Sequence, residues 1–118
     1  MAKKKLDAGI QAVTPERAQR LFRLLNLLGQ GPQTRLAITR KLRLAIRGFY
    51  RDLETLREVG VSVKLSGGRY QLESDLALSL ENLPFPDPAL TLGEARLLAR
   101  GRSAVHRKIK TLLDRVEN

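Results

Sequence analysis

Residues 45–60, AIRGFYRDLETLREVG, decide the fold, because they read as one amphipathic helix. At 100° per residue, the apolar side chains of this stretch fall within one third of the helix wheel, and they are Ile46, Phe49, Leu53 and Leu56. Charged side chains lie roughly opposite, and they are Arg47, Arg51, Glu54 and Glu58. We therefore expect one face to pack in a core and the other to present two arginines, one turn apart, to a partner.

The composition of the whole chain points to an anionic partner. Twenty-two Lys and Arg against 12 Asp and Glu give 118 residues a net charge of +10, which favours nucleic acid or an anionic surface. There is no cysteine, so disulfides, thiolate metal sites and a thiol nucleophile are excluded, and an intracellular setting is the default. No apolar run is long enough to span a bilayer, so we expect no membrane partner.

Two further helices are predicted before the opening stretch. Thr14, followed by Pro15, is typical of a helix start, and apolar spacing then predicts a helix to about Leu28. Thr34 is placed to cap a second, short helix that runs from Arg35 to about residue 41. Residues 42–44 join this short helix to the helix of residues 45–60, which is basic at its start. Two helices joined in this way form the pattern of a helix-turn-helix.

The opening stretch is followed by a predicted β-hairpin. Residues 61–65 (VSVKL) and 69–72 (RYQL) alternate between apolar and polar side chains and flank Ser66-Gly67-Gly68. Val61, Val63 and Leu65 are expected on a core side, whereas Lys64 and Arg69 are expected on a basic side.

These elements together resemble the N-terminal DNA-binding domain of bacterial transcriptional regulators that carry a WYL effector domain, and more distantly the DeoR type. The resemblance covers roughly residues 15–72, and its strongest matches are Tyr50-Arg51-Asp52-Leu53, Leu56-Arg57, Gly60-Val61 and Gly67-Gly68-Arg69-Tyr70-Gln71-Leu72. It implies a winged helix-turn-helix over 14–72, with a recognition helix at 45–59 and a wing at 61–72. The expected fold class is therefore mainly α with a small β-hairpin, followed by a C-terminal helix pair.

Two departures from the family fall in the first turn of the expected recognition helix. Ala45 stands where the family usually has a capping Ser or Thr, and Gly48 stands where a small polar residue is usual. A missing cap and an internal glycine each cost about 1 kcal/mol of helix stability. Such a start either orders on DNA or has drifted because base reading is no longer required.

Composition and apolar spacing indicate the nature of the remaining segments. Residues 1–13 read as a basic flexible arm, either a solvated tail or a source of non-specific phosphate contacts. Residues 73–90 read as an acidic, proline-containing linker, because they hold four acids, no base and three prolines. Residues 91–118 read as a helical tail capped at Thr91 and Ser103, whose apolar stripe either packs within the chain or forms a homodimer.

The outward-facing positions supply candidate contacts with double-stranded DNA. Base-edge candidates at the start of the recognition helix are Ile46, Arg47, Tyr50 and Arg51. Ile46 either meets a thymine methyl or joins the core, and Tyr50 either reaches a phosphate or packs under the wing. Phosphate or minor-groove candidates, each weighed against a solvated surface position, are Thr34, Arg35, Arg40, Arg43, Lys64 and Arg69.

Other residues are not expected to carry chemistry. Asp52 lies at the edge of the core face, so a structural hydrogen bond or salt bridge is expected. His106 is the only histidine and has no carboxylate at metal-ligand spacing, so it reads as a solvated side chain. No catalytic residue, cofactor or metal site is predicted.

The sequence thus predicts a cytoplasmic, nucleoid-associated DNA-binding regulator without enzymatic activity. The chain contains no tryptophan, so a small-molecule effector domain of the WYL kind is not expected, and the chain is either a stand-alone unit or a fragment of a longer regulator. The main alternative is a protein-interaction adaptor or a non-specific nucleic-acid binder on the same scaffold. RNA or single-strand binding has less support, because the chain holds only five aromatic residues.

Overall fold

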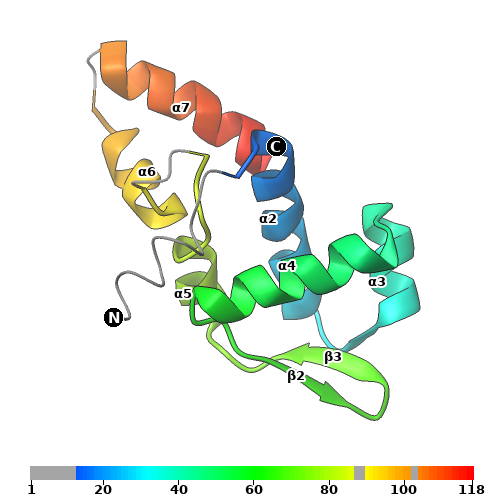
Figure 1. Ribbon diagram of the computed structural model, residues 1–118. Helices are drawn as coiled ribbons and strands as arrows, with labels where there is room; N and C mark the ends of the chain where they lie inside the picture. Colours follow the sequence, from blue (N-terminus) through cyan, green and yellow to red (C-terminus); the bar gives the residue numbers. More distant parts are fainter. Residues whose placement is uncertain (1–12, 87–89, 102–103) are drawn as a thin grey trace.

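The computed structural model describes residues 13–86, 90–101 and 104–118, so the basic arm (up to residue 12) and the cap expected at Ser103 lie outside the described residues. The described part is mainly α-helical with a small antiparallel sheet, which confirms the predicted fold class. Figure 1 shows α4 lying across α2, with the β-hairpin along one side of α4 and the α6–α7 pair at the other end of the molecule.

Helix α2 (Pro15–Gly29) is the centre of the core. The Thr14 hydroxyl accepts a hydrogen bond from the Arg17 N–H at 3.1 Å, which confirms the predicted cap. Three leucines of this helix, Leu21, Leu24 and Leu25, have no exposed surface. Burying a leucine side chain fully contributes about 2 kcal/mol, so α2 organises the elements that pack around it.

Helices α3 (Arg35–Leu42) and α4 (Ile46–Glu58) form the predicted pair joined by a tight turn. Thr34 caps α3 by accepting from the Ala37 N–H at 3.1 Å, as the sequence predicts. Phe49 and Leu56 of α4 are completely buried, but Ile46 is 51% exposed. Of the two interpretations of Ile46, the core position is therefore wrong, because the first turn of α4 extends beyond the core.

The sheet has one more strand than the sequence predicts. Strands β2 (Val63–Ser66) and β3 (Arg69–Leu72) form the expected hairpin, and β1 (Gln33–Thr34) pairs with the free edge of β3 in the order β1-β3-β2. Gly67 and Gly68 both have positive φ, as a two-residue hairpin turn of type I′ requires. Leu65 is 58% exposed and does not join the core side of the hairpin, whereas its register partner Tyr70 packs against the core.

Residues 73–90 do not form the predicted linker in their described part. Helix α5 (Leu76–Glu81) is capped by the Asp75 carboxylate and packs against α2. Leu83 and Phe85 are then buried, and backbone bonds join Leu83 O to Leu92 N and Phe85 N to Leu90 O. The described part of this segment belongs to the core, because Leu83, Pro84 and Phe85 are buried after α5 has ended.

The C-terminal helices pack on the same core. Helix α6 (Leu92–Leu98) begins with a capping box between Thr91 and Glu94, and α7 (Ala104–Glu117) lies against α2 and α6. An ion pair of 3.1 Å joins Arg115 of α7 to Glu16 of α2. Of the two expected roles of the tail, packing within the chain is the one that the structure shows.

Candidate nucleic-acid interface

The start of α3 and the middle of α4 are joined by one hydrogen bond. Arg35, the first residue of α3, donates from Nη1 to the Tyr50 hydroxyl at 2.8 Å, and both side chains are exposed. This contact lowers the pKa of Tyr50, because the guanidinium stabilises the ionised phenol. The arginine at the start of α3 is thereby held against the exposed face of α4.

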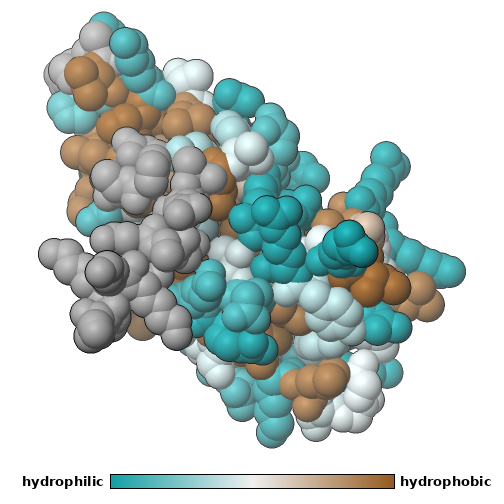
Figure 2. All heavy atoms as spheres, viewed as in Figure 1, coloured by the Kyte–Doolittle hydropathy of each residue, from teal (hydrophilic) through white to brown (hydrophobic). Residues whose placement is uncertain are grey.

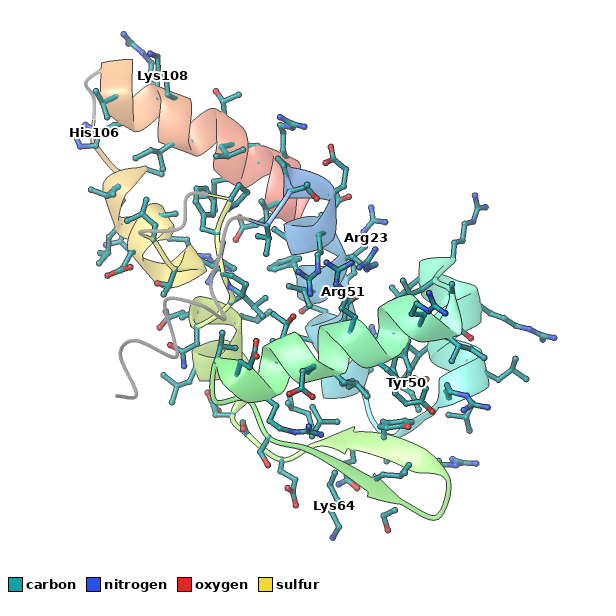
Figure 3. All side chains as sticks on the ribbon, viewed as in Figure 1. Arg23, Tyr50, Arg51, Lys64, His106 and Lys108 are labelled. Carbon is teal, nitrogen blue, oxygen red and sulfur yellow. The ribbon has the colours of Figure 1, made fainter. Side chains whose placement is uncertain are left out.

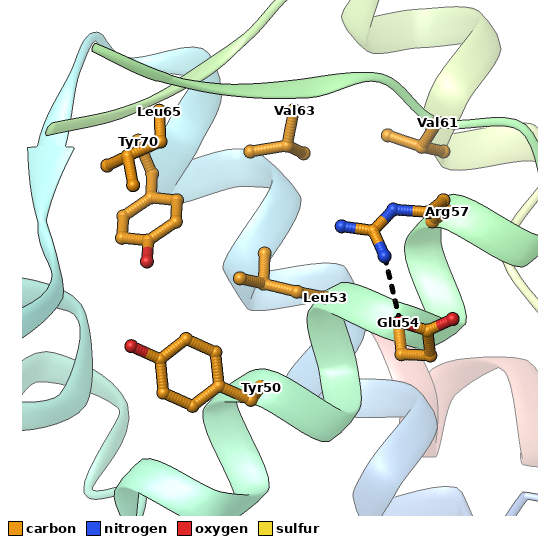
Figure 4. A pocket seen from close by; sticks show the side chains of 8 residues that line it. All are labelled: Tyr50, Leu53, Glu54, Arg57, Val61, Val63, Leu65 and Tyr70. Carbon is orange, nitrogen blue, oxygen red and sulfur yellow. Dashed lines mark hydrogen bonds and ion pairs between the residues drawn. The ribbon is translucent and has the colours of Figure 1, made fainter.

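Tyr70 brings the hairpin into the same group of side chains. Its ring lies edge-on to Phe49 at 5.1 Å between ring centres, and its hydroxyl faces that of Tyr50, as Figure 4 shows. Burial raises the pKa of Tyr70, and the hydrogen bond to Tyr50 adds to the shift. Tyr50 remains 44% exposed, so it packs beside the hairpin and also presents its ring to solvent.

Pairing of β1 with β3 places the turn end of the wing, where Arg69 follows Gly67 and Gly68, beside the start of α3. Thr34 is the register partner of Arg69, and Lys64 lies opposite Gln71 on the outer strand. Thr34, Lys64 and Arg69 are all exposed. Two segments separated by 35 positions in the chain therefore present their polar side chains together, which sequence periodicity could not reveal.

The exposed face of α4 carries Arg47 and Arg51. Both side chains are exposed, and neither forms an ion pair with a carboxylate in the part of the chain that the structure describes. The first turns of α3 and α4 contain no acidic residue, so their partial positive charge is not neutralised locally. The first turns of α3 and α4 and the exposed face of α4 are therefore positively charged.

The structure shows a different consequence of each departure at the start of α4, Ala45 and Gly48. Ala45 occupies the cap position with extended backbone and makes no side-chain capping bond, so the weak start inferred from the sequence is present. A Cβ at Gly48 would lie 2.8 Å from Leu44 Cδ1. Glycine therefore leaves room for Leu44 beneath the turn between the two helices.

Arg43, one of the phosphate candidates, has a backbone conformation that favours glycine. Its φ is +51°, the only positive φ of a non-glycine residue among those described. The turn is closed by bonds from Arg43 N to Arg40 O and from Leu44 N to Thr39 O, at 3.3 and 2.9 Å. Both Arg40 and Arg43 are exposed at this turn.

Asp52 fastens α4 to α2 from the buried side. Its carboxylate has no exposed surface and accepts from Arg17 at 3.4 Å and from Arg20 at 2.6 and 3.0 Å. The hydrogen bond to Asp52 raises the pKa of Arg20, because it stabilises the charged guanidinium. The predicted structural role of Asp52 is confirmed, but its partners on α2 were not predicted.

A cleft separates α4 from the hairpin. Its volume is about 380 Å³, and Figure 4 shows Leu53 and Val63 on its walls and the two tyrosines at one end. Glu54 and Arg57 form an ion pair of 2.9 Å at its other end. These side chains supply no nucleophile with an adjacent base, and no cluster of metal-binding side chains is present among the described residues.

The structure brings most candidate residues to one face. Arg35, Tyr50 and Arg69 are joined through the α3–α4 and β1–β3 contacts, and Arg47 and Ile46 lie on the neighbouring turn of α4. Gln33 and Tyr70 support this face and were not among the candidates: β1, which holds Gln33, is too short to give a periodic signal, and the position of Tyr70 on the apolar side of its strand predicts only packing. Figure 2 shows hydrophilic and hydrophobic side chains interspersed over α4 and the hairpin, without one continuous apolar surface.

Comparison with known proteins does not extend this description. No protein-family model, curated protein or solved structure matches the chain. Within the described residues, no helix combines the length and the apolar composition that a bilayer crossing requires.

Proposed function

We propose that the chain binds double-stranded DNA as a winged helix-turn-helix regulator, with α4 in the major groove and the β2–β3 hairpin as the wing. The observation that carries the proposal is the convergence of three elements on one face. The Arg35–Tyr50 bond joins α3 to α4, and the Thr34–Arg69 register joins α3 to the hairpin. The cations on this face have no carboxylate partner among the described residues.

Charge supports the same conclusion. Residues 34–72 hold nine Lys and Arg against three Asp and Glu, and two of the three acids are already paired. Arginine at the start of a helix in the major groove can bond a guanine edge through two N–H groups, which is worth about 1–3 kcal/mol of discrimination. Arg47 is the residue best placed for this role, because it lies at the centre of the exposed face of α4.

The adaptor alternative has less support. It relied on the apolar stripe of the C-terminal helix as a surface for a partner, but Leu113 and Val116 are buried in the core beside α2. The cationic face around α3, α4 and the hairpin would remain without a role in that alternative.

Salt dependence of affinity tests the proposal. Fluorescence anisotropy with a short mixed-sequence duplex should give a straight line of log affinity against log salt, with a slope near −5 if about six phosphates are neutralised. The single strand should bind more weakly, because the chain offers no row of exposed aromatic residues for base stacking. A flat salt response, or equal affinity for the single strand, would contradict duplex binding.

A further inference from the structure

Helix α2 carries a group of arginines that the proposed interface does not use. Arg17, Arg20 and Arg23 follow one another at three-residue spacing, and the first two share the carboxylate of Asp52. Arg23 is exposed and forms no ion pair among the described residues. One carboxylate therefore faces two arginines, and a third arginine follows without a counter-charge.

Arg23 follows the two arginines of α2 that contact α4. Arg17 donates to Thr55 and to Asp52, and Arg20 donates to Asp52, so these contacts meet α4 within one turn. Arg23 lies three residues beyond Arg20 on α2.

Figure 3 shows the same arrangement from the side of α4. Arg23 and Arg51 lie on one flank of α4 in this view, whereas Tyr50 and Lys64 lie on the flank of the hairpin. Arg51 is exposed and lies one turn before Thr55, whose hydroxyl accepts from Arg17 of α2, so Arg51 belongs to the flank that faces α2.

Two of the acids near this flank are paired elsewhere. Glu16 at the start of α2 pairs with Arg115 of α7, and Glu54 of α4 pairs with Arg57 beside the cleft. Neither acid neutralises Arg23 or Arg51, so this flank stays positive although Asp52 is buried beneath it.

We infer that Arg23 and Arg51 form a second phosphate-binding flank, on the side of α4 opposite the hairpin. The inference rests on the proposed function. The major groove is about 12 Å wide, so a helix that lies in it has a sugar-phosphate backbone on each side. The hairpin and the start of α3 face one backbone, and Arg23 and Arg51 face the other. Arg51 is thereby moved from base reading to phosphate binding, and Arg23 joins the interface.

The test compares Arg23→Gln with a matched Arg107→Gln control. Arg107 is exposed on α7 and precedes Lys108, which Figure 3 shows at the far end of the molecule. Affinity for the same mixed-sequence duplex is measured over a range of salt concentrations. Loss of one phosphate contact should reduce the steepness of the salt dependence by about 0.9 and weaken binding roughly fivefold to tenfold at about 0.1 M salt.

The outcomes separate the inference from the proposed function. Arg107→Gln should match the wild type in slope and affinity, and Arg23→Gln/Arg51→Gln should lose about twice the slope of Arg23→Gln. If the wild type binds the duplex but Arg23→Gln has an unchanged slope of log affinity against log salt, the inference of a second phosphate-binding flank is wrong and the proposed function stands. If the wild type does not bind the duplex at low salt, the proposed function itself is wrong. Unfolding curves should confirm that Arg23→Gln folds, because its side chain is exposed.

Discussion

Two N–H groups of Arg20 bond both oxygens of the buried Asp52 carboxylate, Nε to Oδ2 at 2.6 Å and Nη2 to Oδ1 at 3.0 Å. This two-point contact fixes the roll of α4 on α2, because rotation of α4 would break both bonds together. It therefore determines which side chains of α4 point away from the core.

Replacing this carboxylate should destabilise the protein. Asp52→Asn keeps the shape but removes the charge that Arg17 and Arg20 share, and loss of a buried charged partner costs about 3 kcal/mol. Urea unfolding at neutral pH measures the change. The control is Asp114→Asn. Asp114 is exposed on α7 and has no ion pair among the described residues, so this variant should change stability by less than about 0.5 kcal/mol. Equal stability of the two variants would contradict the inference that the Asp52 carboxylate holds α4 on α2.

The two tyrosines should titrate on opposite sides of pH 10. Arg35 lowers the pKa of Tyr50, whereas burial raises that of Tyr70, and the chain has no other tyrosine. Tyrosinate absorbance should rise in two steps, of which Tyr50→Phe removes the lower and Tyr70→Phe the upper. Because the folded pKa of Tyr70 is raised, its contribution to stability is present below pH 10 and lost as the pH rises through its folded pKa. A single step at the ordinary pKa in the wild type would contradict the Arg35–Tyr50–Tyr70 contacts.

The turn at Arg43 should gain stability from glycine. An L-residue in the left-handed region costs roughly 1 kcal/mol, and Arg43→Gly removes that cost at a φ of +51°. Gly60 closes α4 in the same way with a φ of +87°, so Gly60→Ala should lose about the same amount that Arg43→Gly gains. Thermal unfolding measures both variants. If Arg43 also binds phosphate, Arg43→Gly should bind duplex more weakly although it is more stable. A lower unfolding temperature in Arg43→Gly would contradict the claim that the positive φ of Arg43 costs stability.

A side-chain cap should strengthen the start of α4. Ala45→Ser places a hydroxyl at a position whose φ of −69° and ψ of 154° already suit a cap, and it should add about 1 kcal/mol to the free energy of unfolding. The reverse change, Thr34→Ala at the start of α3, should lose a similar amount because it removes the bond to the Ala37 N–H. Ala45→Ser without any gain in urea unfolding would mean that α4 does not begin where the structure places it.

The helix caps and the hairpin turn were predictable from the sequence, because they depend only on residues close together in the chain. The caps at Thr14, Thr34 and Thr91 and the Gly67-Gly68 turn are local, so their residue types identify them. The acidic segment after the hairpin was misassigned, because its acids and prolines concealed the apolar side chains that reach the core. Phe85 and the proline before it are buried, and no pattern in the sequence shows that a non-helical segment reaches the core.

The candidate face was predictable only in part. Periodicity identified the exposed side of α4 with Arg47 and Arg51, and the hairpin pattern identified Arg69. The Arg35–Tyr50 bond joins residues 15 positions apart on different helices, and no periodic pattern encodes that distance. Ile46 was ambiguous for a similar reason, since helix spacing does not show where the core ends.

Selection of bound duplexes from a random library, at physiological salt, tests sequence-specific recognition by α4 most directly. The wild type should enrich a defined motif, and Arg47→Glu should lose that preference because it reverses the charge of the arginine proposed to read a base edge. Arg69→Ala should instead weaken all duplexes about equally and keep the motif. Failure of the wild type to enrich any motif, or an unchanged motif in Arg47→Glu, would contradict recognition through α4.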